Sequence, residues 1–155
     1  MKIAIASDHG GFELKETIGE ALLKKGIETM DFGTFSEESV DYPDFALKVG
    51  EAINNKEADL GILVCGTGIG MSIAANKIDG IRCALCSDVY SAKMTRGHNN
   101  ANVLALGQRV LGDGLAMMIV DTFINSHFEG GRHQRRLDKI KDIENGYKGN
   151  DGNEA

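Results

Sequence analysis

The chain has 155 residues, of which 42% are hydrophobic, and a formal net charge of −6 at pH 7. This length suits one domain with a single core, and the negative charge provides no basic field that would attract nucleic acid. We therefore expect a single domain over residues 1–147, no nucleic-acid partner, and an anion site only where arginines gather locally. Residues 148–155 lack apolar content and are predicted to form a flexible C-terminal tail.

The N-terminal apolar run, residues 3–6, is too short for a signal-peptide core or a membrane span. Three cysteines do not make an even secretory framework, so we expect free thiols, a cytoplasmic protein and no membrane partner. Cys83 and Cys86 spell C-x-x-C within an apolar run. In a strand, side chains three apart face opposite sides, so the pair is predicted to be core and not a metal or redox site.

Five apolar runs alternate with segments of helical periodicity. In chain order, we expect a strand over 2–7, a helix from Phe12 toward Gly26, a strand over 27–32, a helix opened by Pro43 and ending near Asn54, a strand over 60–65, a helix from about residue 71, a strand over 81–86, a helix over 89–96, a strand over 103–106, and helices over 111–125 and 132–147. This alternation predicts an α/β fold, a Rossmann-like three-layer α/β/α sandwich with a five-stranded parallel sheet.

The strongest functional signal follows the third expected strand. Cys65 ends that strand, and Gly66, Gly68 and Gly70 follow at alternate positions. Glycines let the backbone turn sharply and approach a ligand, and amides at a helix start lack intrahelical partners. A thiol at such a corner is favoured as the thiolate, and Thr67 can donate a hydrogen bond to it. On this segment alone, a base or nucleophile beside an anion site and a buried structural cysteine before an ordinary turn both stay open.

Polar residues also follow the first strand and precede the fifth. Asp8 and His9 end the first strand, so they should share the carboxyl edge of the sheet with Cys65, where such folds bind ligands. The pair suits acid–base work, although a helix cap beside a surface histidine explains it equally well. His98 and Asn99 come before the fifth strand, which puts them at the opposite edge or in a partner's site.

Arginines supply the candidate anion site. Arg132 and Arg136 lie four apart at an expected helix start and can clamp a phosphate, or they form an ordinary solvated face; Arg109 is a third candidate. The glycine loop departs from the dinucleotide fingerprint, because Met71 occupies the place of its last glycine, and no P-loop lysine follows. Nucleotide binding by a non-catalytic module therefore stays a minor hypothesis.

Five motifs in order resemble the type B ribose-5-phosphate isomerase family, and the resemblance covers about residues 1–145. They lie at residues 7–15, 39–44, 65–72, 98–102 and 130–136. The resemblance implies interconversion of D-ribose 5-phosphate and D-ribulose 5-phosphate through a cis-enediolate, with no metal and no organic cofactor. It also implies a homodimer, sometimes paired into a tetramer, whose sites combine residues of two subunits. Isomerisation of a six-carbon substrate, allose 6-phosphate or galactose 6-phosphate, remains the alternative.

The resemblance also implies a role for each candidate residue. Cys65 would be the base, Thr67 would position or activate it, His98 would open the furanose ring, and Asp8 would handle protons. Met71 stands where a carboxylate-dependent branch carries glutamate, so the thiol is the implied base. The implied substrate contacts are His9, Tyr42, Gly66, Gly68, Ile69, Gly70, Asn99, Arg109, Arg132 and Arg136.

Overall fold

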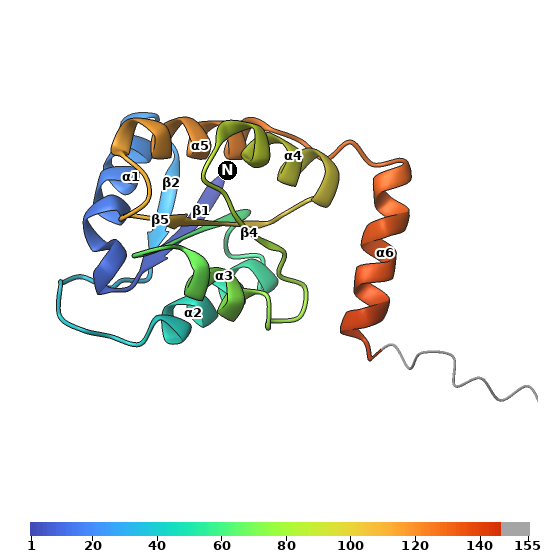
Figure 1. Ribbon diagram of the computed structural model, residues 1–155, viewed down its shortest axis with the longest axis horizontal. Helices are drawn as coiled ribbons and strands as arrows, with labels where there is room; N and C mark the ends of the chain where they lie inside the picture. Colours follow the sequence, from blue (N-terminus) through green and yellow to red (C-terminus); the bar gives the residue numbers. More distant parts are fainter. Residues whose placement is uncertain (147–155) are drawn as a thin grey trace, which may run out of the picture.

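The computed structural model describes residues 1–146, so the expected tail at 148–155 lies outside the described residues. Its centre is a parallel five-stranded sheet in the order β2-β1-β3-β5-β4 (Figure 1). The strands are β1 (Lys2–Ser7), β2 (Glu28–Asp31), β3 (Leu60–Cys65), β4 (Cys83–Leu85) and β5 (Val103–Gly107). The predicted α/β fold with a five-stranded parallel sheet is confirmed.

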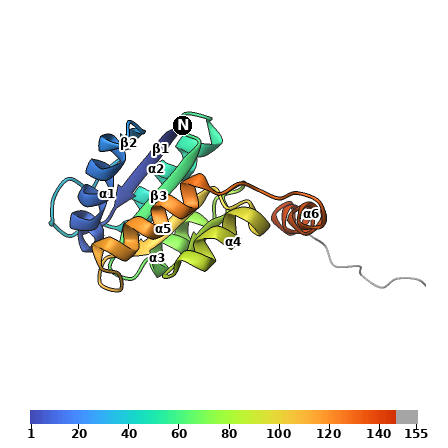
Figure 2. The same cartoon turned by 90° about the horizontal axis from the view of Figure 1, so that it is seen from above.

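Helices cover both faces of this sheet (Figures 1 and 2). One face carries α1 (Phe12–Lys24), α4 (Val89–Asn99) and α5 (Asp113–Asn125), and the other carries α2 (Tyr42–Asn54) and α3 (Ile69–Ala75). Side chains of β3 alternate between the two layers: Ile62 and Val64 pack with the first group, whereas Leu63 and Cys65 pack with the second. The alternation aims the Cys65 side chain toward α2 and α3.

The C-x-x-C pair divides between the two cores. Cys86 is buried in the cluster that includes α4 and α5, and Cys83 packs against the cluster that includes α2 and α3. Both thiols are free, so the predicted core role of this pair is confirmed. Burial raises the pKa of Cys83 to about 12 and that of Cys86 to about 11, which makes both thiols poor nucleophiles.

Several expected boundaries differ from the observed ones. β2 and β4 are shorter than the apolar runs that predict them, and α4 continues one turn beyond the expected end near Arg96. His98 and Asn99 therefore lie in the last turn of a helix, which stops at Asn100 in the left-handed conformation (φ 44°). The last helix, α6 (Arg132–Glu144), ends before the expected residue 147.

A buried lysine fixes the segment between β2 and α2. Lys15 on α1 is 1% exposed, and its Nζ lies 2.5 Å from Asp31 Oδ2 and 2.6 Å from Glu16 Oε1. The other carboxylate oxygen of Asp31 accepts a hydrogen bond from Gly33 N at 2.8 Å. This chain of contacts holds the start of the loop that leads to Tyr42.

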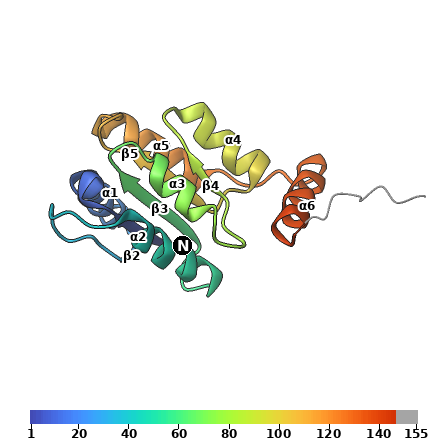
Figure 3. The ribbon, with the colours of Figure 1, turned by 60° about the horizontal axis from the view of Figure 1, so that its bottom comes forward.

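Helix α6 stands apart from the sandwich, beyond the β4 edge (Figures 1 and 3). It follows Gly130 and Gly131, which both have positive φ angles of 66° and 56°. A groove of about 750 Å³ lies beside it, lined by Asn99, Ile140 and Ile143 among others. Across the described chain, no helix combines the length and apolar character needed to cross a membrane.

Candidate active site

The Cys65 thiol lies at the carboxyl end of β3 and is 5% exposed. Its Sγ accepts a hydrogen bond from the backbone N–H of Gly68 at 3.0 Å. Gly68 has φ +77°, and a Cβ there would lie 2.5 Å from Leu85 Cδ1 and 2.9 Å from the carbonyl carbon of Leu106. Glycine at position 68 therefore lets the loop aim its amide at the sulfur.

Thr67 and Ile69 complete this turn. The Thr67 Oγ1 accepts from the backbone N–H of Ile69 at 3.3 Å, at the first residue of α3. This bond leaves the threonine O–H to donate elsewhere. The donor that the structure places on the Cys65 sulfur is the Gly68 amide and not the Thr67 hydroxyl.

The end of β1 lies against the end of β3. The Asp8 amide donates to the Val64 carbonyl at 3.2 Å, and a Cβ on Gly10 would lie 3.2 Å from Gly66 N. The expectation that Asp8 and Cys65 share one edge of the sheet is therefore confirmed. Asp8 Oδ1 accepts from Gly10 N at 2.9 Å, so this carboxylate caps the short 3-10 turn over His9–Gly11.

His9 and Tyr42 border the same edge. The Nδ1 of His9 accepts a hydrogen bond from Val40 N at 3.2 Å, so in the neutral ring the proton lies on Nε2. That N–H is a donor suited to an anionic group. The Tyr42 ring lies over Gly70, where a Cβ would be 2.9 Å from Tyr42 Cζ. A glycine at position 70 thus gives the tyrosine ring its place beside the start of α3.

The segment after β5 joins the same loop. Gln108 N donates to the Cys65 carbonyl and Arg109 N to the Gly66 carbonyl, both at 2.9 Å. The Arg109 side chain lies over Gly66, with Nη1 3.4 Å from the position of a Cβ there. The exposed guanidinium therefore places a positive charge beside the glycine loop. Gln108, whose Oε1 accepts from Leu14 N at 2.9 Å, is a supporting residue that the sequence analysis missed.

The remaining candidates form a second group. His98 and Asn99 end the helix that precedes β5, so parallel topology puts them near the amino edge of the sheet. Arg132 and Arg136 lie exposed on α6, which stands beyond β4 (Figure 1). One chain therefore does not bring these four side chains to its own Cys65. The opposite placement expected for His98 is confirmed.

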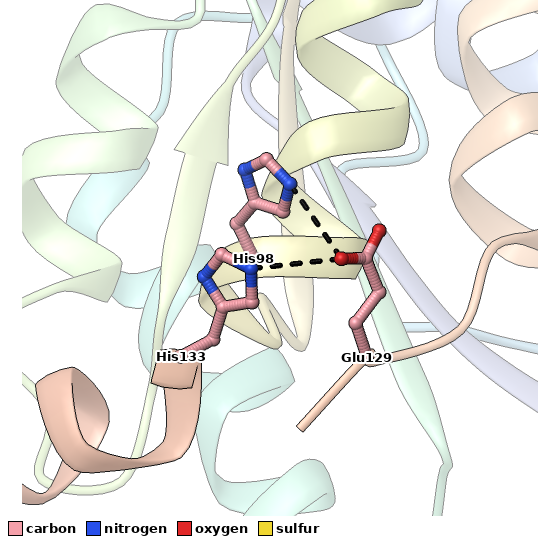
Figure 4. Close-up of side chains that lie close together, drawn as sticks. All are labelled: His98, Glu129 and His133. Carbon is pink, nitrogen blue, oxygen red and sulfur yellow. Dashed lines mark ion pairs between the residues drawn. The ribbon is translucent and has the colours of Figure 1, made fainter. Parts of the chain in front are cut away.

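His98 belongs to a compact cluster with two residues that the sequence analysis did not assign (Figure 4). Glu129 Oε2 lies 3.8 Å from His98 Nε2 and 3.5 Å from His133 Nε2. The two imidazoles stack with centroids 4.3 Å apart and planes 10° from parallel. Burial, followed by the neighbouring His98 and the Arg132 guanidinium, lowers the pKa of His133, so its neutral form is favoured.

These three residues also offer metal-ligand atoms, all within 4.8 Å of one another. The lone pair of an imidazole nitrogen lies in the plane of its ring. Because the His98 and His133 rings are stacked in nearly parallel planes, their nitrogen lone pairs do not point toward one common metal position. The stacked rings would therefore have to turn before both nitrogens could bind one ion. The observed arrangement fits a carboxylate between two imidazoles better than a preformed metal centre.

The fold is that of the parallel α/β proteins that bind ligands at the carboxyl ends of their strands, and this chain gathers a thiol, a carboxylate and an imidazole at that edge. The comparisons with known proteins narrow this class. A family model described as Ribose/Galactose Isomerase matches residues 3–140, and the chain belongs to this family. The predicted family is thus confirmed.

Three relatives illustrate the likeness. Ribose-5-phosphate isomerase B of Escherichia coli (strain K12) is 52% identical over 143 residues, which are 92% of this chain and 96% of that protein. A structure of ribose-5-phosphate isomerase B from Clostridium thermocellum is 58% identical, with a TM-score of 0.94 over 95% of this chain and 99% of that one. The enzyme from Mycoplasma genitalium, solved with bound ribulose-5-phosphate, is 46% identical, with a TM-score of 0.88 over 94% and 97% of the two chains.

Proposed function

We propose that this protein is an aldose–ketose isomerase that interconverts D-ribose 5-phosphate and D-ribulose 5-phosphate. The observation that carries the proposal is the Cys65 thiol, buried at a strand end and hydrogen-bonded to the Gly68 amide. Family membership supports it, and so does the likeness to a relative that holds ribulose-5-phosphate. The substrate is accordingly a phosphorylated sugar.

In the proposed reaction, Cys65 moves one proton between two neighbouring carbons. As a thiolate, it removes the proton from C2 of the open-chain aldose and returns it to C1, with a cis-enediolate between the two steps. The Gly68 N–H stabilises the thiolate, and loop amides from Gly66 to Gly70 stabilise negative charge on the enediolate oxygen. C1 is reduced as C2 is oxidised, and the hydroxyl proton on O2 passes to O1, so the reaction needs no external oxidant or reductant.

Charged and polar side chains would hold the rest of the sugar. His9 presents its Nε2–H, Tyr42 borders the loop, and Arg109 brings a positive charge to it. In this proposal, Arg132 and Arg136 bind the phosphate group. Replacing both by alanine should mainly raise KM, by about 100-fold; an unchanged KM would argue against the clamp.

We further propose a homodimer, or dimers paired into a tetramer, in which each site combines residues of two subunits. His98, Asn99, Arg132 and Arg136 lie away from their own Cys65, so a second copy is the natural source of these groups. Apolar side chains beside the glycine loop are exposed and offer a surface for such a copy. They are Ile69 (51% exposed), Leu85 (42%) and Val110 (59%).

We propose that residues 1–147 act as a single sugar-phosphate isomerase domain in the cytoplasm. A single sheet carries the Cys65 loop, which supports one domain. The three cysteines of the chain are free thiols, the state that a reducing compartment favours.

The decisive experiment measures turnover of ribose 5-phosphate by the purified protein and by Cys65→Ala. We expect the wild type to isomerise the pentose phosphate with a higher kcat/KM than allose 6-phosphate, and the variant to bind a phosphorylated sugar acid without turnover. A fully active Cys65→Ala would refute the assignment of the base. Preference for allose 6-phosphate, or binding of a nucleotide without turnover, would instead favour the alternatives.

The shared site has its own test. Cys65→Ala and His98→Asn subunits, each inactive alone, are unfolded together, mixed in equal amounts and refolded. Half of randomly assorted dimers are then hybrids with one intact site of two, so we expect about a quarter of wild-type activity to return. No recovery, with hybrids demonstrated by mass spectrometry, would refute shared sites.

A further inference from the structure

Glu129 lies beside His98, and its backbone is bonded to the turn of α4 that carries this histidine. Its N–H donates to the Gly97 carbonyl at 3.0 Å, which ties the segment after α5 to the last turn of α4. Its side chain packs over Gly97, where a Cβ would lie 3.1 Å from Glu129 Oε1. With the carboxylate held over this glycine, Oε2 lies 3.8 Å from His98 Nε2 (Figure 4).

We propose that Glu129 is a positioning residue for the opening of the furanose ring by His98, and that the stacked His133 ring holds the same imidazole in place. This inference rests on the proposed function, because it assumes that His98 meets the cyclic sugar in the site of a second subunit. It adds two residues to the machinery, neither of which would touch the substrate.

The carboxylate selects which His98 nitrogen faces the sugar. A negative charge on the Nε2 side favours a proton on that nitrogen. Nδ1 points away from Glu129 in Figure 4 and is the nitrogen left for the substrate. The His133 ring, stacked 4.3 Å away and 5% exposed, limits rotation of His98 about its side-chain bonds.

The ring-opening step then balances as follows. The His98 imidazolium gives its Nδ1 proton to the ring oxygen, and the bond between C1 and that oxygen breaks with its electron pair going to the oxygen. The anomeric hydroxyl loses its proton to the Asp8 carboxylate of the second subunit, and C1 becomes the aldehyde. His98 is left neutral with its proton on Nε2, the form that Glu129 favours.

Glu129 supplies a negative charge to a cluster whose neighbouring arginines are positive. Besides Glu129, the ionisable groups near His98 include the stacked His133 from α6, which the Arg132 and Arg136 guanidiniums in turn influence. Without Glu129, the His98 imidazolium would lie among positive or neutral groups. Glutamine at position 129 keeps the shape of the side chain and removes only the charge.

The test separates ring opening from proton transfer. Ribulose 5-phosphate is acyclic, because its C5 oxygen carries the phosphate and cannot close a furanose ring. In D2O, exchange of its C1 proton, followed by NMR, therefore reports proton transfer by Cys65 without ring opening. Conversion of ribose 5-phosphate requires both steps. Four variants are compared with the wild type: Glu129→Gln, His98→Asn, Cys65→Ala, and Glu57→Gln as the control, which neutralises an exposed carboxylate before β3.

We expect Glu129→Gln to lower kcat/KM for ribose 5-phosphate by about tenfold while C1 exchange stays within twofold of the wild type. Cys65→Ala should lose both activities, and Glu57→Gln neither. If Glu129→Gln converts ribose 5-phosphate at the wild-type rate while His98→Asn is impaired, the inference about Glu129 is overturned and the proposed function stands. Equal loss of conversion and exchange in Glu129→Gln would also overturn it, whereas an active His98→Asn would refute the role of His98 itself.

Discussion

Replacing Gly68 by alanine tests whether the left-handed turn after Cys65 builds the site. Gly68 has φ +77° and donates its N–H to the Cys65 sulfur. An alanine Cβ would lie 2.5 Å from Leu85 Cδ1, which is the end of a flexible side chain, and 2.9 Å from the carbonyl carbon of Leu106, which is backbone. The Leu85 contact can relax, but the Leu106 contact requires the loop or β5 to shift.

The expected cost has two parts. The left-handed conformation costs an alanine about 1–2 kcal/mol relative to glycine, and backbone overlap of this kind adds about 1–2 kcal/mol. We therefore expect Gly68→Ala to lower the free energy of unfolding by about 2–4 kcal/mol. Because the shift moves the amide away from the sulfur, kcat should fall by about 100-fold or more.

Urea unfolding at one fixed protein concentration and steady-state kinetics measure the two effects. Gly19→Ala is the matched control, since Gly19 lies within α1 and a Cβ there meets nothing within 4 Å. That variant should gain about 0.5–1 kcal/mol and keep its activity. If Gly68→Ala unfolds at the wild-type urea midpoint and retains wild-type kcat, the link between this turn and the chemistry is wrong.

Three further predictions concern buried titratable groups. Burial raises the pKa of Cys83 and Cys86, so iodoacetamide at pH 8 should modify the loop thiol first, and mass spectrometry showing equal rates would contradict this. The lowered pKa of His133 means that the unfolded chain binds this proton more strongly, so the free energy of unfolding should fall as pH falls through about 6.5. The fall should be less steep in His133→Gln. If the urea midpoints of the wild type and of His133→Gln change equally between pH 5 and 7.5, this prediction is refuted. Lys15→Met leaves two carboxylates without their cation, so it should lower the free energy of unfolding in urea by about 2–4 kcal/mol. The control Lys24→Met, at an exposed lysine, should lower it by less than about 0.5 kcal/mol. Equal losses in the two variants would contradict a stabilising buried ion pair.

Local pattern predicted most of the fold. Continuous apolar runs identify β1 and β3 with their observed bounds, and Pro43 marks the start of α2. The end of α4 escaped prediction because its last turn is polar, and the stop comes from the left-handed conformation of Asn100 and not from a glycine. Lys15 escaped prediction because a lysine in an amphipathic helix pattern indicates a solvated face, whereas its partner Asp31 comes from β2, further along the chain.

The candidate site was predictable in part for the same reason. Parallel topology places Asp8 and Cys65 at one edge and His98 near the other, and sequence order alone is enough for that inference. The Glu129 and His133 pair depends on the path that the chain takes through the two intervening glycines, which no periodicity encodes. Glu129 stands four residues before His133, and that spacing is the one signal that could have drawn attention to them.

The detached position of α6 has a consequence for how activity depends on concentration. Under the proposed sharing of sites, a newly synthesised subunit carries Arg132 and Arg136 on α6 and Cys65 in the sandwich, and it is inert toward the sugar phosphate until it meets a second copy. Specific activity should then decline on dilution below the dissociation constant of the assembly, and substrate that bridges two subunits should slow that decline. Catalysis would in that sense begin with an encounter between chains and not with the folding of either one.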